Sequence, residues 1–370
     1  MKVGFDACRI VEQKTAVGIY AAELLFQFSR LNTPHTFILF HNSLFKMPEP
    51  VPADLPVRTS LRRKVLFWNI IDLPKMIRKE GIDIFHAPYN FGGPIKKICP
   101  LIITVHDLIP VMFPEYCSRK FRTIAQISYR LSIPQADRII TISEASKRDI
   151  VRLYGCEDKI RVIPQGVSDN FRVIKDTGLI ENTLKRLHLP GEYILYVGKL
   201  EVRKNIATII DAYSRLKKGA WDIPPLVLVG KPGVGFDLIQ RKIESAKLGK
   251  AVYHLNYVAE EDLPAVYNGA LLFVFPSFYE GFGFPPLEAM ACGTPVICSN
   301  VSSLPEVVGD GGMLIPPNDV ESLKNAMNEV LFNRDYASKL AEKGLKRASL
   351  FSWRQTAIKT INIYKEVFDL

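Results

Sequence analysis

Short apolar runs alternate with longer amphipathic runs along almost the whole chain. In the first half the apolar runs are KVGFDA (2–7), FILFH (37–41), IDIFHAP (82–88), LIITVHD (101–107), RIITIS (138–143) and IRVIPQ (160–165). They are nearly continuous in apolar residues, which is typical of strands buried on both faces of a parallel sheet. The runs between them, at 18–31, 60–81 and 144–155, have the spacing of amphipathic helices. This order predicts a doubly wound α/β domain.

A polar segment at 167–192 interrupts the alternation, and a second series follows it. We interpret this segment as an interdomain linker with one short helix. The second series predicts strands at 192–198, 225–230, 252–256, 271–277 and 295–300, with helices at 205–218, 236–248, 261–269 and 286–292. The sequence therefore predicts an α/β protein with two Rossmann-like doubly wound parallel-sheet domains, residues 1–170 and 171–353.

Length and composition agree with two cytoplasmic domains. A chain of 370 residues exceeds one ordinary core, and 48% of its residues are hydrophobic. The six cysteines form no CxxC pair or Cys/His cluster, which predicts reduced thiols. The charged start MKVGFDACRI predicts a first strand and no signal peptide. The longest apolar runs, such as ALLFVFP, fall far below the roughly 20 residues of a membrane span.

Nearly all of the net positive charge lies in the first half of the chain. Residues 1–180 hold 26 Lys and Arg against 17 Asp and Glu, whereas residues 181–370 hold 22 against 21. The basic segments at 60–79 and 118–130 also carry large apolar side chains, including Phe67 and Trp68 in the first. Such segments can bind an anionic membrane surface, or they can pack their apolar sides on the sheet and only keep the protein soluble.

Two acids lie where ligands of doubly wound domains bind, beyond the carboxyl end of a predicted strand. The loop FYEGFGFPP holds Glu280, and its glycines let the backbone approach a ligand closely. Pro286 suits the first position of the next helix, with Glu288 in the first turn. The free amides at a helix N-terminus can bind a phosphate group, which would repel a carboxylate. Two carboxylates at this place therefore indicate that the ligand also has sugar hydroxyls, which can donate hydrogen bonds to them. Alternatively, Glu288 only complements the helix dipole.

A second loop, YVGKLEVRKN, places three cations directly after a predicted strand. Lys199, Arg203 and Lys204 can neutralise a diphosphate and stabilise the charge that develops as it leaves. Alternatively, these three cations bind no ligand and are simply solvent-exposed residues at the end of the strand. In the first domain, His106 follows a strand and precedes Asp107, so it can contact a ligand or serve as a structural hydrogen-bonding group.

Motifs throughout the chain resemble a known family. In the second half these are YVGKLEVRKNI, LVLVGKPG, LNYVAEEDLPAVYNGA, FPSFYEGFGFPPLEAMACGTPVICSNVSSLPEVVGDGG and FSWRQTA; upstream they are FDACRI, AVGIYAAEL, DIFHAPYN, TVHDLIP, ADRIITISEASKRDI and KIRVIPQGV. On these segments the chain resembles the retaining glycosyltransferases of family 4, which have the GT-B fold. The two glutamates separated by seven residues are the family's hallmark.

The resemblance implies a role for each matching residue. Lys199 and Lys204 would hold the nucleotide diphosphate, with Arg203 beside them, and Glu288 would take the ribose hydroxyls. The donor sugar would be held by the loop residues Glu280, Gly281, Phe282, Gly283 and Phe284, and His106 would face it from the first domain. Gly18 would let the backbone approach the phosphates. Tyr257 and Val258 would line the base. The sequence departs from the family at Lys199, usually Arg, at Gln165, usually Asn, and at Asn256, often Gly.

The resemblance also implies a reaction. A hexose would pass with retention from a nucleotide-diphosphate sugar to a glycan or lipid-linked acceptor in bacterial surface polysaccharide (O-antigen or lipopolysaccharide) synthesis. HDLIPVMFPEY weakly favours mannose from GDP-mannose. No cofactor is expected, and no metal ion, because the chain has no Asp-x-Asp motif. Helix 354–370 would return to the first domain, which would bind the acceptor at the inner face of the cytoplasmic membrane.

Other functional classes fit less well. A nicotinamide oxidoreductase needs GxGxxG after its first strand, and GKPGVG at 230–235 has different spacing. A nucleic-acid-binding protein is not expected, because no recognition motif accompanies the basic first half. A catalytically silent family member that serves as a partner subunit is the alternative we keep, although the complete glutamate pair and the lysines argue against it.

Overall fold

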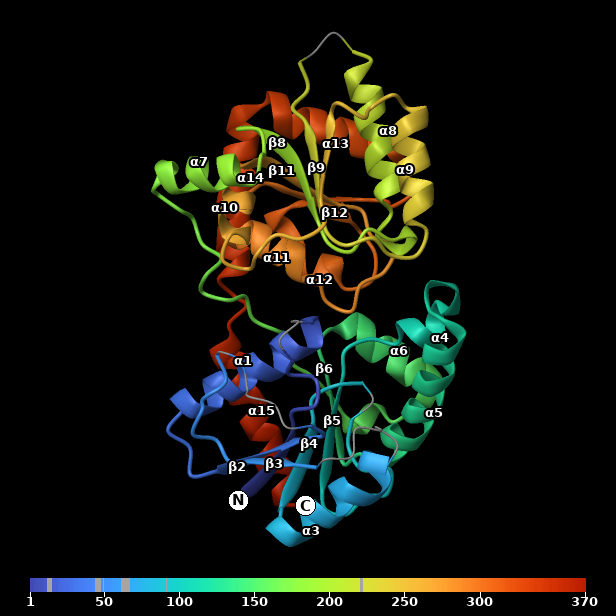
Figure 1. The fold of residues 1–370 in the computed structure, drawn as a ribbon, viewed down its shortest axis with the longest axis vertical. Coiled ribbons are helices and arrows are strands. Elements are labelled where there is room, and N and C mark those ends of the chain that lie inside the picture. Colours follow the sequence, from blue (N-terminus) through green and yellow to red (C-terminus); the bar gives the residue numbers. More distant parts are fainter. Residues whose placement is uncertain (12–14, 44–47, 49, 61–66, 91, 220–221) are drawn as a thin grey trace. The chain divides into compact units, whose positions relative to one another are not determined.

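The chain folds into two compact units, one of which contains both termini. The computed structural model describes residues 1–11, 15–43, 48, 50–60, 67–90, 92–219 and 222–370. Unit 1 comprises residues 1–166 and 352–370, and unit 2 comprises residues 167–351. The sequence had placed these boundaries after residues 170 and 353. Each unit is an α/β sandwich with helices on both faces of a central sheet (Figure 1).

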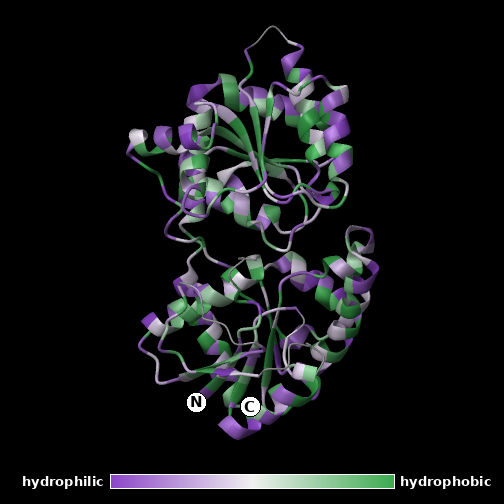
Figure 2. Ribbon diagram, viewed as in Figure 1, coloured by the Kyte–Doolittle hydropathy of each residue, from purple (hydrophilic) through white to green (hydrophobic). Residues whose placement is uncertain are grey.

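Within the described residues of unit 1, seven parallel strands form one sheet in the order β3-β2-β1-β4-β5-β6-β7. The strands are β1 Lys2–Asp6, β2 Thr36–His41, β3 Val57–Thr59, β4 Ile84–Ala87, β5 Leu101–Val105, β6 Arg138–Thr141 and β7 Ile160–Val162. These strands are largely apolar in the hydropathy colouring of Figure 2, and most of their apolar residues are buried in the core. The sequence missed β3, because this three-residue edge strand is only half-buried and carries little apolar signal.

Helices cover both faces of this sheet. They are α1 Ala16–Arg30, the π-helical turn η1 Trp68–Asp72, α3 Leu73–Glu80, α4 Ile109–Met112, η2 Pro114–Tyr116, α5 Arg119–Gln135, α6 Glu144–Tyr154, η3 Glu157–Lys159 and α15 Trp353–Phe368. The basic cluster of the segment predicted at 60–79 lies at 62–64, outside the described residues. Trp68 in this segment is 1% exposed and belongs to the core, so this side chain follows the second of the two alternatives, packing inside unit 1.

The last helix, α15, is anchored in unit 1. The hydroxyl of Tyr364 lies 2.7 Å from Nδ1 of His86 on β4. Nε of Arg138 on β6 lies 2.8 Å from the carboxylate of Glu366. α15 also lies beside α1 in Figure 1. These contacts complete one helix layer of unit 1 with the end of the chain.

In the described part of unit 2, six parallel strands form a sheet in the order β10-β9-β8-β11-β12-β13. The strands are β8 Tyr193–Val197, β9 Leu226–Val229, β10 Val252–Leu255, β11 Ala270–Phe275, β12 Val296–Ser299 and β13 Met313–Ile315. The helices are α7 Thr177–Arg186, η4 Val202–Lys204, α8 Ile206–Lys217, α9 Phe236–Ser245, α10 Leu263–Asn268, α11 Phe284–Ala291, α12 Leu304–Val308, η5 Gly309–Gly311, α13 Val320–Phe332 and α14 Arg334–Ala348.

The segment predicted as a linker, 167–192, is instead an integral part of unit 2. Asn268, at the end of α10, accepts a hydrogen bond from the Ile174 amide at 2.9 Å and donates one to the Arg172 carbonyl at 2.9 Å. The ring of Phe171 packs edge-on against Tyr267. The segment reads as a linker because its exposed face is polar, whereas two long-range hydrogen bonds and one aromatic contact hold it to α10.

Strand order determines which loops meet in unit 2. The order reverses between β8 and β11, which are adjacent in the sheet although 72 residues separate the end of one from the start of the other. A ligand of an open α/β sheet binds at the carboxyl ends of the strands, at such a switch point. The loop that follows β8 and the loop that follows β11 therefore meet there.

Candidate active site

The loops after β8 and β11 are tied together by hydrogen bonds before any ligand is considered. The carbonyl of Arg203, on η4, accepts a hydrogen bond from the Phe278 amide at 3.0 Å. The side-chain amide of Asn205 donates to the Pro276 carbonyl at 3.0 Å. Asn205 has a left-handed backbone, φ 56°, which ends η4 and starts α8. The loop after β8, which carries the cations, is thus fixed against the loop after β11, which carries Glu280.

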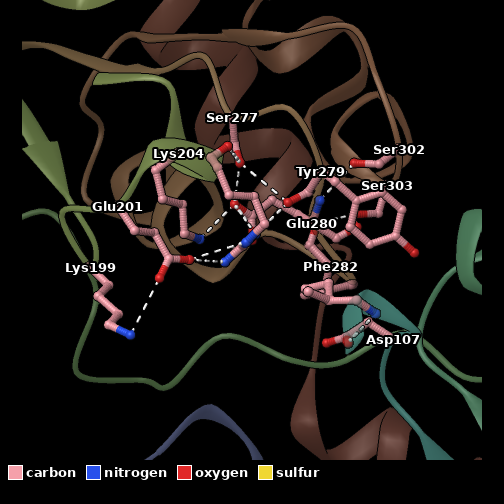
Figure 3. A network of polar contacts seen from close by, with 12 residues as sticks. Asp107, Lys199, Glu201, Lys204, Ser277, Tyr279, Glu280, Phe282, Ser302 and Ser303 are labelled. Carbon is pink, nitrogen blue, oxygen red and sulfur yellow. Dashed lines mark hydrogen bonds and ion pairs between the residues drawn. The ribbon is translucent and has the colours of Figure 1, made fainter. Parts of the chain in front are cut away.

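A charged network joins the predicted cations to the first glutamate (Figure 3). Nζ of Lys204 lies 2.6 Å from Oε1 of Glu280, and the guanidinium of Arg203 lies 3.4 Å from the same atom. Glu201 accepts from Arg203 at 2.8 Å and lies 3.4 Å from Nζ of Lys199. The structure therefore brings Lys199, Arg203, Lys204 and Glu280 together.

This network is largely buried. The side chains of Arg203 and Lys204 are 10% and 11% exposed, whereas Lys199 is 56% exposed. Buried charges are tolerated only when they are paired and hydrogen-bonded, and each of these has an opposite partner. Three cations against two carboxylates leave one net positive charge, which suits the binding of an anion.

Glu280 is held ionised by its partners. Burial acts to raise the pKa of its carboxyl, but the charges of Lys204 and Arg203, with hydrogen bonds from Lys204 and Ser277, outweigh that effect and hold the pKa below its usual value. The described hydrogen bonds and ion pairs of this carboxylate all involve Oε1. The arrangement supplies a carboxylate acceptor beside fixed ammonium donors.

Serines anchor the backbone of the glutamate loop. The Ser302 hydroxyl accepts from the Glu280 amide at 3.0 Å, and the Ser303 hydroxyl donates to the carbonyls of Glu280 and Phe282 at 2.9 and 2.6 Å. Gly283 then turns the chain into α11 with φ 128°, a conformation that side chains rarely adopt. The Phe282 ring packs on Phe284.

The second glutamate lies deeper in its helix than predicted. α11 begins at Phe284, so Pro285 occupies the second helical position and Pro286 is not the first residue. Glu288 consequently falls in the second turn, where the helix dipole has little effect on it. Its Oε2 accepts a hydrogen bond from the Tyr267 hydroxyl at 2.8 Å. Burial raises the pKa of Glu288 to about 7, although the bond from Tyr267 opposes this shift.

The predicted base-binding residues follow β10. Tyr257 is 69% exposed, and Nζ of Lys231 lies 5.7 Å from the centre of its ring. Val258 is 5% exposed and belongs to the core. None of the described contacts joins these two residues to the charged network.

In unit 1, His106 lies just beyond the carboxyl end of β5, with both ring nitrogens bonded. Nε2 lies 3.0 Å from the Pro88 carbonyl, so it carries the proton and donates. Nδ1 then accepts from the side-chain amide of Gln165 at 3.2 Å. Burial lowers the pKa of His106 to about 4, so the imidazole is neutral.

Gly18 lies in the first turn of α1. Its amide donates to the hydroxyl of Thr15, the N-cap, at 3.1 Å. A side chain at this position would approach the Arg9 carbonyl oxygen at 2.6 Å. The close approach that requires glycine here is thus to the chain's own backbone.

The chain matches two family models and a full-length relative. Residues 17–171 match the model for Glycosyltransferase Family 4, and residues 185–347 match the model for Glycosyl transferases group 1. O-antigen chain mannosyltransferase B of Escherichia coli is 32% identical over 382 aligned residues, covering 99% of this chain and 100% of the relative. The chain belongs to the family 4 glycosyltransferases. The predictions of family and of a transferase enzyme are confirmed.

Two further comparisons concern the fold and the relatives of this glycosyltransferase. Serotype-specific mannosyltransferase WbdA of E. coli is 34% identical over 275 residues, 71% of this chain but 32% of the relative. The structure of Anabaena Alr3699/HepE in complex with UDP and glucose superposes with a TM-score of 0.77 at 18% identity, covering 99% of this chain and 100% of that one. The predicted fold of two parallel Rossmann-like domains is confirmed.

Sequence reasoning missed several polar residues of this glycosyltransferase. They are Glu201, Ser277, Ser302 and Ser303 around Glu280, and Tyr267 beside Glu288. An acid inside the basic loop KLEVRKN was a usable signal for Glu201. The serines of SNVSS after β12 were another, since that strand neighbours β11. Tyr267 left no such signal, because it lies in an apolar helical run.

No described helix is both long enough and apolar enough to cross a membrane. In the same ranges, no group of three or more His, Cys, Asp or Glu side chains could hold a metal ion.

Proposed function

We propose that this glycosyltransferase moves a mannosyl group, with retention, from GDP-mannose to a lipid-linked glycan acceptor in bacterial O-antigen synthesis. The observation that carries the proposal is the largely buried charged network at the switch point of unit 2, formed by Lys199, Arg203, Lys204 and Glu280. The relatives described above, both named mannosyltransferases, support the sugar and the pathway.

In this proposal the cations bind the donor diphosphate without a metal ion. Lys199, half-exposed, approaches the phosphates first, and Lys204 is already oriented by its bond to Glu280. As the bond between the anomeric carbon and the phosphate oxygen breaks, negative charge grows on the leaving diphosphate. Fixed cations in a buried site stabilise that charge more than they stabilise the bound donor, and this difference lowers the barrier.

In this proposal Glu280 holds the donor sugar, and the acceptor attacks the same face of the sugar from which the diphosphate departs. Oε1 is engaged by Lys204 and Ser277, and Oε2 is our proposed acceptor for a hydroxyl of the donor sugar. The acceptor hydroxyl attacks the anomeric carbon from the face that the diphosphate leaves. The departing phosphate oxygen takes the proton of that hydroxyl, so the configuration is retained and atoms and charges balance.

The proposal is tested by supplying GDP-mannose, UDP-glucose, ADP-glucose and dTDP-glucose in turn with a lipid-linked mannan acceptor. We expect mannose transfer, with slow hydrolysis of GDP-mannose alone. The anomeric configuration of the product, read by NMR, tests retention, and an unchanged rate after chelation of divalent ions tests metal independence. If no nucleotide sugar is bound or turned over, the catalytically silent alternative is correct.

We also propose that α5 brings unit 1 to an anionic membrane surface, where a lipid-linked acceptor resides. Ala125, Tyr129 and Ile133 form the buried side of this helix. On the other side Ile124, Ile127 and Leu131 are 50%, 54% and 42% exposed. Basic residues accompany them, namely Arg119, Lys120, Arg122 and Arg130. An apolar stripe with basic neighbours matches acyl chains beneath anionic headgroups.

Vesicle flotation tests this surface. Wild-type protein should float with vesicles of phosphatidylglycerol and phosphatidylcholine, and far less with phosphatidylcholine alone. Ile124→Ser with Ile127→Ser should lower the partition coefficient about ten-fold or more, because each side chain contributes about 1.5–3 kcal/mol when fully buried. Leu153→Ser on α6, a residue 41% exposed, is the matched control. Equal flotation of both variants would exclude α5 as the membrane contact.

A further inference from the structure

Tyr267 is a rigid part of the wall beside Glu288. Its side chain is fully buried, and its carbonyl accepts a hydrogen bond from the Thr294 hydroxyl at 2.7 Å. Its ring packs against Phe171 and Phe273, with centroid distances of 5.9 and 5.6 Å. The phenol hydroxyl is therefore fixed in place when it donates to Oε2 of Glu288 at 2.8 Å.

This bond leaves Glu288 with the right number of acceptor positions for a diol. An ionised carboxylate has about four acceptor positions on its two oxygens, and Tyr267 takes one. Two neighbouring hydroxyls can then donate one bond to each oxygen. A protonated carboxyl loses one of these positions to its own hydrogen, so it accepts a diol poorly.

The titratable groups around Glu288 set its charge. Tyr267 lies on α10, Glu260 lies in the segment ahead of α10, and Cys292 is the residue that directly follows α11. Burial raises the pKa of Glu288 to about 7 and Glu260 acts in the same direction, whereas the Tyr267 bond lowers it. Burial also raises the pKa of the Tyr267 hydroxyl and the Cys292 thiol, so both stay neutral near pH 7.

The other helices packed against α11 bring few charges to this carboxyl. α14 contributes Arg347, whose Nε donates to the Val307 carbonyl of α12 at 3.0 Å. A second bond from its guanidinium goes to the Glu306 carbonyl. Arg347 thus serves the end of α12 and not Glu288.

We propose that Tyr267 is a positioning residue that holds Glu288 ready for the vicinal diol of the donor ribose, and that this pair makes donor binding depend on pH near neutrality. The inference rests on the proposed function, in which the donor is a nucleotide sugar. Its specific content is the role of Tyr267 and the proton on Glu288.

Calorimetric titration between pH 6 and pH 8.5 tests the pair. The probes are GDP-mannose and its 2′,3′-dideoxy analogue, with UDP-glucose and its dideoxy analogue as a second set. Nucleotide-sugar diphosphates do not titrate in this range, so a change in affinity reports the protein. For wild type we expect the ribose ligand to bind more tightly as the pH rises through about 7, whereas the dideoxy ligand binds equally throughout.

Tyr267→Phe removes only the hydroxyl. At pH 7 we expect it to weaken binding of the ribose ligand about five-fold, the usual value of one hydrogen bond, and to restore most of the affinity at pH 8.5. Tyr193→Phe is the matched control, because that buried hydroxyl also bonds α10, at the Val266 carbonyl at 2.6 Å, without touching Glu288. A purely structural role would weaken both ligands at every pH, and such a result would overturn the inference.

A ligand-free measurement separates this inference from the proposed function. The side-chain carboxyls of the glutamates are followed by ¹³C NMR, with Glu288→Gln assigning the resonance. Its midpoint should lie near neutrality in wild type and rise in Tyr267→Phe. If no nucleotide sugar binds, the proposed function fails. If one binds but its affinity is independent of pH and of the ribose hydroxyls, only the inference fails.

Discussion

The carboxyl ends of the two sheets carry polar groups of different kinds. In unit 2 the groups are ions, with Lys204 paired to Glu280 inside a largely buried network. In unit 1 the histidine beyond the end of β5 is neutral, because burial lowers the pKa of His106 to about 4, and burial likewise lowers the pKa of His86, inside β4, to about 3. A buried ion pair holds charge ready for a charged ligand, whereas neutral donors and acceptors suit hydroxyl groups. This difference agrees with our proposal, in which unit 2 binds the diphosphate of the donor and unit 1 meets the glycan acceptor.

Burial keeps both His86 and His106 neutral, but their hydrogen-bond partners differ. His86 lies inside β4, where the Tyr364 hydroxyl and the Thr104 hydroxyl, 2.7 and 2.9 Å away, occupy its ring nitrogens. His106 lies beyond β5, where its partners are a backbone carbonyl and Gln165. His86 therefore joins strands and α15, whereas His106 lies at the edge where a ligand of the sheet would bind.

The largest expected effect is the loss of Glu280. Glu280→Ala should leave the protein folded and abolish transfer, a loss of about 1,000-fold or more, because it removes the acceptor for the sugar and the partner that orients Lys204. Transfer assays and circular dichroism measure the two properties. Glu321→Ala is the control, since Glu321 pairs with Arg215 on an exposed surface of the same unit. An unchanged transfer rate would remove Glu280 from the site.

The next largest effect is the loss of donor affinity when a lysine is replaced, and we expect this loss to be larger for the more buried lysine. Lys204→Met keeps the length of the side chain and should weaken GDP-mannose binding by about ten- to a hundred-fold, the usual range for a charge-assisted hydrogen bond. Lys199→Met should cost less, because that side chain is 56% exposed and its charge is screened by water. Calorimetry gives both constants. Equal losses would mean that burial does not decide which cation binds the diphosphate.

In unit 1, substitutions of His106 and His86 should have different effects on turnover and on stability. We expect His106→Ala to lower the turnover rate about ten-fold and to change the dissociation constant of GDP-mannose by less than about two-fold. His86→Ala should lower the melting temperature while the folded fraction retains its turnover. If His106→Ala affects only stability, His106 is a structural hydrogen-bonding group, as the sequence had left open.

The smallest expected effect is a difference in acid sensitivity. The folded pKa values of His86 and His106 lie below the ordinary 6.5, so their stabilising contribution is complete above pH 6.5 and is lost as the pH falls. The pKa of Glu288 is raised to about 7, so its contribution is complete below pH 4.5 and is lost as the pH rises.

Between pH 7 and pH 5.5, unit 1 should therefore lose stability relative to unit 2, by on the order of 1 kcal/mol for each histidine. Hydrogen exchange followed by mass spectrometry reports the two units separately. His106→Gln should reduce the pH dependence of unit 1 and leave that of unit 2 unchanged. A parallel decline of both units would contradict this assignment.

Much of this architecture could be predicted from local pattern. The buried strands are continuous apolar runs, and strand order alone brings the loop of Lys204 to the loop of Glu280. What could not be predicted depends on distant packing. The bond between Tyr267 and Glu288, the serines under the glutamate loop and the docking of 167–192 on α10 each join residues whose approach depends on register and helix rotation. An apolar run predicts that a helix is buried, but it does not predict which of its hydroxyl groups will bond a residue on a neighbouring helix.

The start of α11 illustrates the same limit. Pro286 is a good first helical residue, but Gly283 already supplies the turn, and the helix begins two residues earlier. The earlier start places Glu288 in the second turn of α11, and this depends on the turn at Gly283 and not on the more conspicuous prolines.

The chain crosses between the units twice, and the two crossings adjoin. The Val167 amide donates to the Phe351 carbonyl at 3.2 Å, so the ends of unit 2 are neighbours. Unit 2 is in this sense a domain inserted into unit 1. Residues 167–351 therefore form one continuous piece of chain, whereas unit 1 would become a single piece only if residue 166 were joined to residue 352.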